Sequence, residues 1–143
     1  MNIDIVEQKK DLQVIIECKQ INEQIIRLKS HIELFDNKIQ AKSENEVCFI
    51  NSADVLYFES VDNRIFLYTE DKVMEIKQRL YELELILSDK DFIRISKSQI
   101  VNINKVSTLK PEINRTILLT MCNKERLSVS RKYVKAFRQM LSI

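Results

Sequence analysis

Glycine is absent from the 143-residue sequence. Phosphate-binding loops, dinucleotide-binding fingerprints and nucleophile elbows all depend on glycine, because only glycine lets the backbone approach a phosphate closely or adopt a strained turn. The sequence therefore argues against a nucleotide-binding enzyme. Long apolar stretches are also missing: the longest uncharged run, residues 116–123, has eight residues, whereas a membrane helix needs roughly 18 apolar residues.

Histidine and cysteine are scarce. His31 is the only histidine, and no catalytic motif surrounds it, which argues against a Ser–His or Cys–His site. The three cysteines, Cys18, Cys48 and Cys122, are far apart and fit neither a disulfide framework nor paired zinc knuckles. We expect them to be buried, reduced thiols. No pair of carboxylates stands out by its spacing, so we expect no catalysis, metal or cofactor.

The size and composition are those of one soluble globular domain with a short appendage. The chain is 45% hydrophobic and 31% charged, which is typical of that class. The N-terminus carries no basic leader followed by an apolar stretch, so we expect no secretory signal. These features together predict a cytoplasmic protein.

Charge is distributed unevenly along the chain. Residues 1–44 and 45–91 carry net charges of −1 and −6, whereas residues 92–143 contain eleven basic and two acidic residues, a net charge of +9. Clustered lysine and arginine are typical of a surface that binds a polyanion, because they release counterions when they neutralise phosphates. A solvated basic surface without a partner is the alternative. If the basic segment binds nucleic acid, we expect the acidic segment to face away from it.

Residues 1–44 are predicted to form an N-terminal extension of strands and a helix. Residues 3–6 and 12–16 are short apolar runs rich in β-branched residues, which is typical of strands. Over residues 19–35 the apolar spacing of three and four predicts a helix, with a seam of Ile21, Ile25, Leu28, Ile32 and Phe35. Because the seam is too short for a free coiled coil, the helix packs either on its own domain or on a second copy.

From residue 46 onward the apolar residues alternate, which predicts a mainly β domain over residues 45–143. Asp62 and Asn63 can form a turn without glycine, because asparagine and aspartate tolerate the left-handed region. Asn123 and Lys124 predict a second hairpin. The predicted strands cover residues 47–49, 55–58, 65–68, 73–76, 92–95, 106–109, 116–122 and 127–129.

Two helices are predicted within this domain, over residues 77–88 and 130–141. Ser130 can cap the second helix through its hydroxyl, which would accept from amides of the first turn. The only proline, Pro111, is expected in a loop, where its missing N–H does no harm.

The order of the motifs resembles a known family. The runs VLYFESVDNRIFLYTEDKVMEIKQRLYELELIL (55–87), FIRISKSQIVNINKV (92–106) and LSVSRKYVKAF (127–137) are similar to the LytTR domain, the DNA-binding module of bacterial response regulators. The resemblance covers residues 46–142. It implies a mostly β fold of short antiparallel sheets with a C-terminal helix, in which loops rather than a recognition helix enter successive major grooves. The chain resembles stand-alone members of the family that lack a receiver domain.

The resemblance also implies which residues contact DNA. Lys97 in the RISKS motif and Arg131 in the VSRKYV motif match base-contacting positions of the family, and Asn63 or Arg64 would supply a third contact. Arginine can pair bidentately with guanine, whereas lysine acts as a flexible point charge. Other polar and basic residues would hold the phosphates and fix the register of the duplex: Arg94, Ser98, Lys132, Lys135 and Arg138.

Some positions depart from the family or have a structural interpretation. Ser96 stands where the family commonly has a histidine, which puts the preferred bases in doubt. Asn102 is expected to fasten a turn through its amide. Tyr57, Phe58 and Phe66 are expected in the core, since the aromatic signature of RNA-binding domains is missing.

We therefore expect a sequence-specific regulator of transcription that binds double-stranded DNA without catalysis. Because one good base contact contributes only about 1–3 kcal/mol, we expect a homodimer on paired half-sites of a promoter, joined through the 19–35 helix. Stand-alone members of the family are often encoded beside a small membrane protein, which is a second expected partner; no small-molecule substrate is expected. Two alternatives are a protein-interaction module whose basic end binds an acidic partner and a small metal-free hydrolase, which would need a strongly perturbed carboxylate in a pocket or His31 in a cleft.

Overall fold

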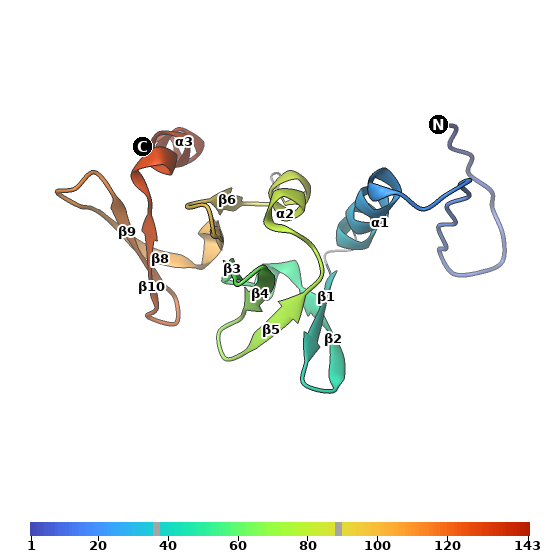
Figure 1. Ribbon diagram of the computed structural model, residues 1–143, viewed down its shortest axis with the longest axis horizontal. Coiled ribbons are helices and arrows are strands. Elements are labelled where there is room, and N and C mark those ends of the chain that lie inside the picture. The colour runs from blue at the N-terminus through green and yellow to red at the C-terminus, as the bar shows by residue number, and fades with distance from the viewer. Residues whose placement is uncertain (36–37, 88–89) are drawn as a thin grey trace.

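The computed structural model describes residues 1–35, 38–87 and 90–143, apart from the side chains of residues 33–35. These residues form two antiparallel sheets and three α-helices (Figure 1). The larger sheet has the strand order β2-β1-β5-β4-β3-β7-β6, and the smaller has the order β10-β9-β8. The elements are α1 (Glu23–Phe35), β1 (Lys38–Ser43), β2 (Glu46–Asn51), β3 (Tyr57–Val61), β4 (Arg64–Tyr68), β5 (Val73–Ile76), α2 (Leu80–Ile86), β6 (Phe92–Arg94), β7 (Gln99–Asn102), β8 (Val106–Pro111), β9 (Ile117–Met121), β10 (Arg126–Val129) and α3 (Arg131–Leu141).

Strands β3, β6 and β7 are buried on both faces. The first core lies between the large sheet and α2, and the second lies between that sheet, the small sheet and α3. Successive side chains of a strand point to opposite faces, so neighbouring residues enter different cores. Phe58, Phe92 and Ile100 enter the first core. Their neighbours Tyr57, Ile93 and Val101 enter the second.

Turns in this chain take left-handed conformations without glycine. Asp62 and Asn63 have φ values of 51° and 63°, and they join β3 to β4 through the flanking pair Val61 and Arg64. Positive φ at both central residues is the geometry whose twist matches that of an antiparallel hairpin. In the β9–β10 hairpin a single residue, Lys124, takes a left-handed conformation, at φ 71°. Both predicted turns are confirmed.

The predicted mainly β fold with a C-terminal helix is confirmed. Strand β5 has the predicted bounds, and α3 ends at the predicted residue. Asn102 is buried and fastens a turn, because its Nδ2 donates to the Val55 carbonyl at 2.9 Å and its Oδ1 accepts from the Asn104 amide at 3.1 Å. Tyr57 and Phe58 are core residues, whereas Phe66 is only half-buried.

The strands predicted at 3–6 and 12–16 are wrong. Residues 1–22 contain no strand, and apolar side chains such as Ile5 and Leu12 are about nine-tenths exposed. A strand needs a partner for its backbone hydrogen bonds, and β-branched composition alone does not supply one. Conversely, the prediction missed β1 and β7. The polar strand β1 pairs with β2 and β5, so the large sheet begins before the predicted domain boundary at residue 44.

Local predictions failed at several further positions. Helix α2 is shorter than the predicted 77–88 range, whose last residue lies outside the described part of the chain. Ser130 is the N-cap of α3, but its hydroxyl makes no capping hydrogen bond. Pro111 ends β8 and pairs with Ile117; β8 is an edge strand, where a missing N–H is tolerated. Two cysteines expected in the core, Cys18 and Cys122, are exposed, and Cys48 is partly buried.

Helix α1 packs on its own domain without burying its whole seam. The Tyr81 hydroxyl of α2 donates to Glu23 Oε1 at 3.1 Å, and Arg27 Cζ lies 5.4 Å from the centre of the Tyr81 ring. Of the predicted seam, Ile21 is 73% exposed. Its three other described side chains, Ile25, Leu28 and Ile32, are half-buried, and that of Phe35 lies outside the description.

Candidate nucleic-acid interface

Three segments with predicted contact residues adjoin one another. The central one, the β6–β7 loop, carries Lys97 and is bonded to a neighbour on each side. Its Ser98 carbonyl accepts from the Ser60 amide at 2.8 Å, next to the β3–β4 turn. Its Ile95 carbonyl accepts from the Ser130 amide at 2.9 Å, directly before Arg131. The fold therefore brings Lys97, the Asp62–Asn63 turn and the start of α3 together, although they lie far apart in the sequence.

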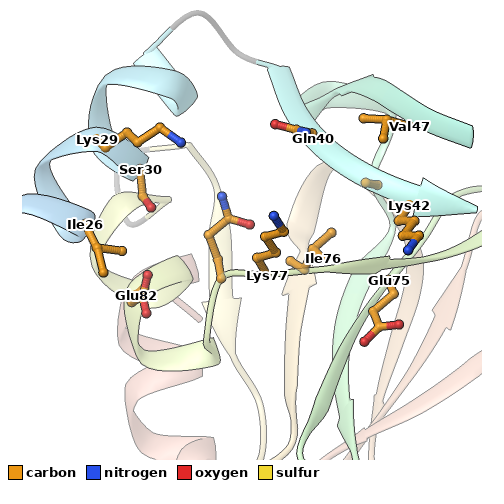
Figure 2. A pocket seen from close by; sticks show the side chains of 12 residues that line it. Ile26, Lys29, Ser30, Gln40, Lys42, Val47, Glu75, Ile76, Lys77 and Glu82 are labelled. Atoms are coloured by element: carbon orange, nitrogen blue, oxygen red, sulfur yellow. The ribbon is translucent and has the colours of Figure 1, made fainter. Parts of the chain in front are cut away.

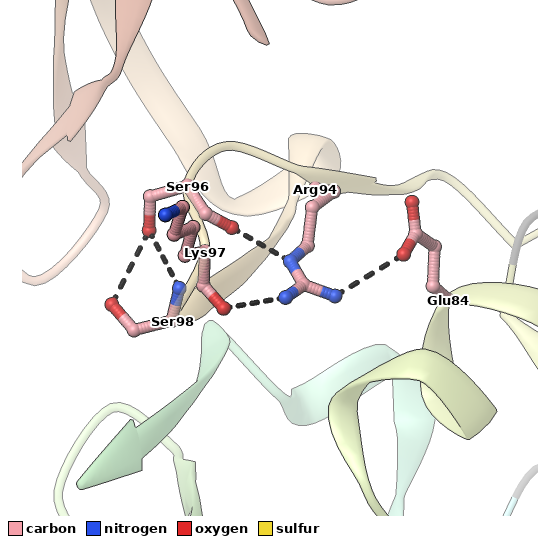
Figure 3. Close-up of polar contacts among 5 residues, drawn as sticks. All are labelled: Glu84, Arg94, Ser96, Lys97 and Ser98. Atoms are coloured by element: carbon pink, nitrogen blue, oxygen red, sulfur yellow. Dashed lines mark hydrogen bonds and ion pairs between the residues drawn. The ribbon is translucent and has the colours of Figure 1, made fainter. Parts of the chain in front are cut away.

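Arg94 holds the β6–β7 loop in shape (Figure 3). Its Nε donates to the Ser96 carbonyl at 2.6 Å, its Nη2 donates to the Lys97 carbonyl, and its Nη1 binds Glu84 Oε2 at 3.1 Å. The Arg94 side chain is 17% exposed. Each guanidinium nitrogen thus has a partner within the chain, and Lys97 is the exposed residue of the loop.

Ser96 also organises this loop. Its Oγ accepts from the Ser98 amide at 3.2 Å and lies 3.4 Å from the Ser98 Oγ. A side-chain oxygen that accepts from the amide two residues on is a common turn device of serine. The residue that departs from the family pattern therefore stabilises the loop locally, and Ser98, predicted to contact phosphate, is half-buried beside it.

The β3–β4 turn is held from β5 and from the segment before α2. Arg79 Nη1 donates to the Asn63 carbonyl at 2.7 Å. Arg64 binds Glu75 with both arms of its guanidinium, with Nη2 to Oε2 at 2.6 Å and Nε to Oε1 at 3.1 Å. Its Cζ also lies 5.2 Å from the centre of the Phe66 ring. Asn63 and Arg64 are both exposed, and the ion pair with Glu75 holds the Arg64 side chain.

The Arg64–Glu75 pair changes the titration of both groups. The hydrogen bond from Arg64 lowers the pKa of the Glu75 carboxyl, and the same bond raises the pKa of the Arg64 guanidinium. Both groups therefore stay charged over the physiological range. The acidic segment does not simply face away from the candidate interface, because Glu75 and Glu84 bind two of its predicted contact residues.

Helix α3 presents a basic face opposite its buried face. Phe137 is fully buried in the second core, and Tyr133, Val134 and Leu141 pack partly against that core. The basic residues of the helix are exposed, and none makes an ion pair with a described residue: Arg131, Lys132, Lys135 and Arg138. Spacings of four and three residues place Arg131, Lys135 and Arg138 on one face of the helix.

The structure thus groups most of the predicted contact residues but separates their roles. Lys97, Ser98, Asn63, Arg64 and Arg131 lie in the three adjoining segments, whereas the other basic residues of α3 extend away along the helix. Sequence reasoning missed the contacts of Arg79 and Glu84. A lone arginine or glutamate before or within a helix gives no signal of a long-range partner, and only coordinates could have found these contacts.

The described residues contain no cluster of three or more histidine, cysteine, aspartate or glutamate side chains placed to hold a metal ion. None of their helices combines the length and the apolar character needed to cross a membrane.

Comparisons with known proteins agree with the architecture. The family model described as the LytTr DNA-binding domain matches residues 45–142. The sensory transduction protein LytT of Bacillus subtilis (strain 168) is 24% identical over 137 residues, which cover 96% of this chain and 57% of LytT. An uncharacterized HTH-type transcriptional regulator of Staphylococcus aureus (strain NCTC 8325 / PS 47) is 36% identical over 100 residues, covering 70% of this chain and 67% of that protein. This chain therefore spans little more than half the length of LytT.

A solved structure shares the fold. A LytTr DNA-binding domain from Bacillus cereus superposes with a TM-score of 0.72 at 31% sequence identity, over 75% of this chain and 98% of the other. The family match covers more than half of the sequence, and the observed sheets and C-terminal helix agree with it. The chain belongs to the LytTr DNA-binding domain family.

Proposed function

We propose that the chain is a sequence-specific regulator of transcription that binds double-stranded DNA in its major grooves. The observation that carries this proposal is the pair of backbone hydrogen bonds that joins the Lys97 loop to the β3–β4 turn and to the start of α3. Three exposed polar segments held side by side can contact one duplex at the same time. The regulators among the relatives support the same function, which involves no catalysis and takes place in the cytoplasm.

The side chains of this interface divide into those that contact DNA and those that hold the contacting loops in place. Lys97, Asn63 and Arg131 are exposed and reach base edges, where arginine can bind guanine bidentately. Arg64 joins them when it exchanges Glu75 for a base or phosphate oxygen. Ser98 and the basic residues of α3 after Arg131 bind phosphates. Arg94, predicted as a phosphate contact, acts through the loop that it holds, because its donors are occupied.

DNA selection at physiological salt tests this function. Genomic fragments enriched by binding to the chain should bind roughly 1,000-fold more tightly than shuffled duplexes of the same composition. Lys97→Ala should lower this ratio, whereas Lys124→Ala, in the β9–β10 turn, should leave it unchanged. Equal affinity for enriched and shuffled duplexes would contradict the proposal and favour a protein-interaction module with an acidic partner.

We further propose a homodimer on paired half-sites, held by the N-terminal extension. Ile21, which directly precedes the first turn of α1, is 73% exposed, so this end of the helix keeps apolar surface for a second copy. A small membrane protein encoded nearby would be a further partner that signals to this dimer.

Ile21→Glu tests the dimer, with Gln20→Glu as a control that adds the same charge at the neighbouring position. In sedimentation experiments Ile21→Glu should raise the dimer dissociation constant at least tenfold, because it places a charge in an apolar contact. It should also weaken binding to paired half-sites and leave binding to a single half-site unchanged. A monomeric wild-type chain, or a variant that dimerises normally, would refute this assignment.

A further inference from the structure

A cavity of about 370 Å³ lies where α1 meets the large sheet (Figure 2). Its walls come from α1, β1, β2, β5 and the start of α2, and its size lies within the range of small-molecule sites. Figure 2 shows Ile26 and Ser30 on the helix side, with Ile76 and Lys77 facing them from the sheet side. The wall is therefore partly apolar and partly charged, which suits a small amphipathic molecule.

Gln78 is a buried polar residue in the wall of this cavity. It is 8% exposed, and its Oε1 has no hydrogen-bond partner among the described residues. A buried acceptor without a partner is destabilising, and natural structures contain few of them. A ligand with an N–H or O–H donor would supply the missing bond.

The charged groups of the wall favour an anion. Lys42 and Lys77 are exposed there, and Lys29 also contributes to the lining. The wall also contains two carboxylates: Glu75 is already bound by Arg64, and Glu82 lies on α2, so the three lysines outnumber the carboxylates. A carboxylate of the ligand would meet lysine at the mouth of the cavity, while its apolar part packs against Ile26, Ala41, Val47 and Ile76.

The cavity wall is linked directly to the β3–β4 turn. Glu75 lines the cavity and binds Arg64 at 2.6 Å. Gln78 also lines it, and the next residue, Arg79, donates to the Asn63 carbonyl at 2.7 Å. A molecule that shifts β5 or the segment before α2 therefore acts on two predicted DNA-contact residues through one hydrogen-bonded contact each.

We propose that this cavity binds a small organic anion with an apolar body and one N–H donor, and that the ligand adjusts the β3–β4 turn. Gln78 Oε1 accepts from the donor, and Lys77 binds the carboxylate. The regulation of DNA binding rests on the proposed function, whereas the ligand site and its link to the turn do not.

NMR titration of the full chain with N-acetyl-L-phenylalanine tests the site. This probe has a carboxylate, an amide N–H and an apolar ring; 3-phenylpropionate lacks the N–H, and the methyl ester of the probe lacks the charge. We expect saturable shifts at the lining residues. Loss of one hydrogen bond should make 3-phenylpropionate bind roughly fivefold more weakly.

Two variants assign the contacts. Gln78→Leu should lower the affinity for N-acetyl-L-phenylalanine roughly fivefold and leave the affinity for 3-phenylpropionate unchanged. The control Gln8→Leu, in the exposed N-terminal segment, should change neither affinity. Lys77→Glu, at an exposed position, should lower the affinity for both acids but not for the methyl ester. Its control, Lys110→Glu on β8, should leave all three affinities unchanged. Absence of saturable shifts, or unchanged binding of both acids to Gln78→Leu and Lys77→Glu, overturns the site.

The link to the turn has its own readout. Saturation with the probe should shift the amide signals of Asn63 and Arg64, which do not line the cavity; shifts confined to the lining residues would refute the link. On enriched DNA, saturating probe should change the affinity at least twofold, and an unchanged affinity would refute the regulation. A chain that binds no DNA would refute the proposed function while leaving the NMR result in force.

Discussion

Two sets of basic residues surround the candidate interface, and they behave differently. In the region of the β3–β4 turn and the β6–β7 loop, Arg64, Arg79 and Arg94 each have partners within the chain. On α3 the basic residues are exposed and make no ion pair with a described residue. Positive charge thus serves two purposes here: the first set stabilises the local structure, and the second is available to bind an anion.

Arginine suits the first purpose because its guanidinium carries five donors in a planar fork. Arg94 uses three nitrogens on two loop carbonyls and one carboxylate. Lysine, a single flexible ammonium, could not span the same set. A count of charges in the sequence treats both kinds of residue alike, although only the exposed ones can neutralise phosphates directly.

Arg94→Ala should have the largest effect of the three tests. If it does not destabilise the fold, the distinction between supporting and exposed basic residues fails. We expect loss of roughly 1–3 kcal/mol of folding stability, because two loop carbonyls lose their donor, together with a fall in DNA affinity. Lys97→Ala should lower DNA affinity with no loss of stability. Thermal denaturation and DNA titration of both variants measure the contrast, and equal stability of the two would show that Arg94 does not support the loop.

A comparison within α3 should give the next largest effect. Arg131→Ala should reduce the ratio of specific to non-specific affinity by about 1–3 kcal/mol. Lys135→Ala should weaken both kinds of binding alike and reduce the salt slope by about one. Titrations at several salt concentrations separate the two. An unchanged ratio for Arg131→Ala would exclude a base-reading role for this residue.

Glu75→Gln should have the smallest effect, because it only releases Arg64 from an exposed pair. We expect roughly a two- to threefold gain in non-specific DNA affinity from one more available cation, and little change in stability. Since the pKa of Glu75 is lowered, any stability from its pair is present above the unfolded-state carboxyl pKa and is lost only as the pH falls through the folded-state value. Between pH 6 and 8 the wild-type pair should therefore cause no change in affinity. A weaker-binding variant would contradict this view.

The sequence predicted the parts of the fold that depend on local patterning. The apolar run that contains Tyr57 and Phe58 and the turn at Asp62 and Asn63 are local signals, and both proved correct. Strand β1 was missed because its sequence, KIQAKS, is mostly polar and buries only Ile39 and Ala41. It forms because neighbouring strands offer it partners, which no window of sequence reveals.

The candidate site was predictable to a similar degree. The resemblance to the family supplied residues that the fold then brought together, including Lys97 and Arg131. It could not tell a supporting arginine from a contacting one, because Arg94 differs from Arg131 only in what surrounds it. The cavity beside α1 was not predicted at all, since its wall combines residues as far apart in the sequence as Ile26 and Glu82.

The absence of glycine has a thermodynamic consequence for the turns. Seven described residues have positive φ, and each carries a Cβ, so each holds a conformation that L-residues normally avoid. In return, the unfolded chain samples fewer backbone states than a glycine-containing one would, which lowers the entropy lost on folding. Forming the Asp62–Asn63 turn therefore costs less backbone entropy than forming the same turn with glycine would.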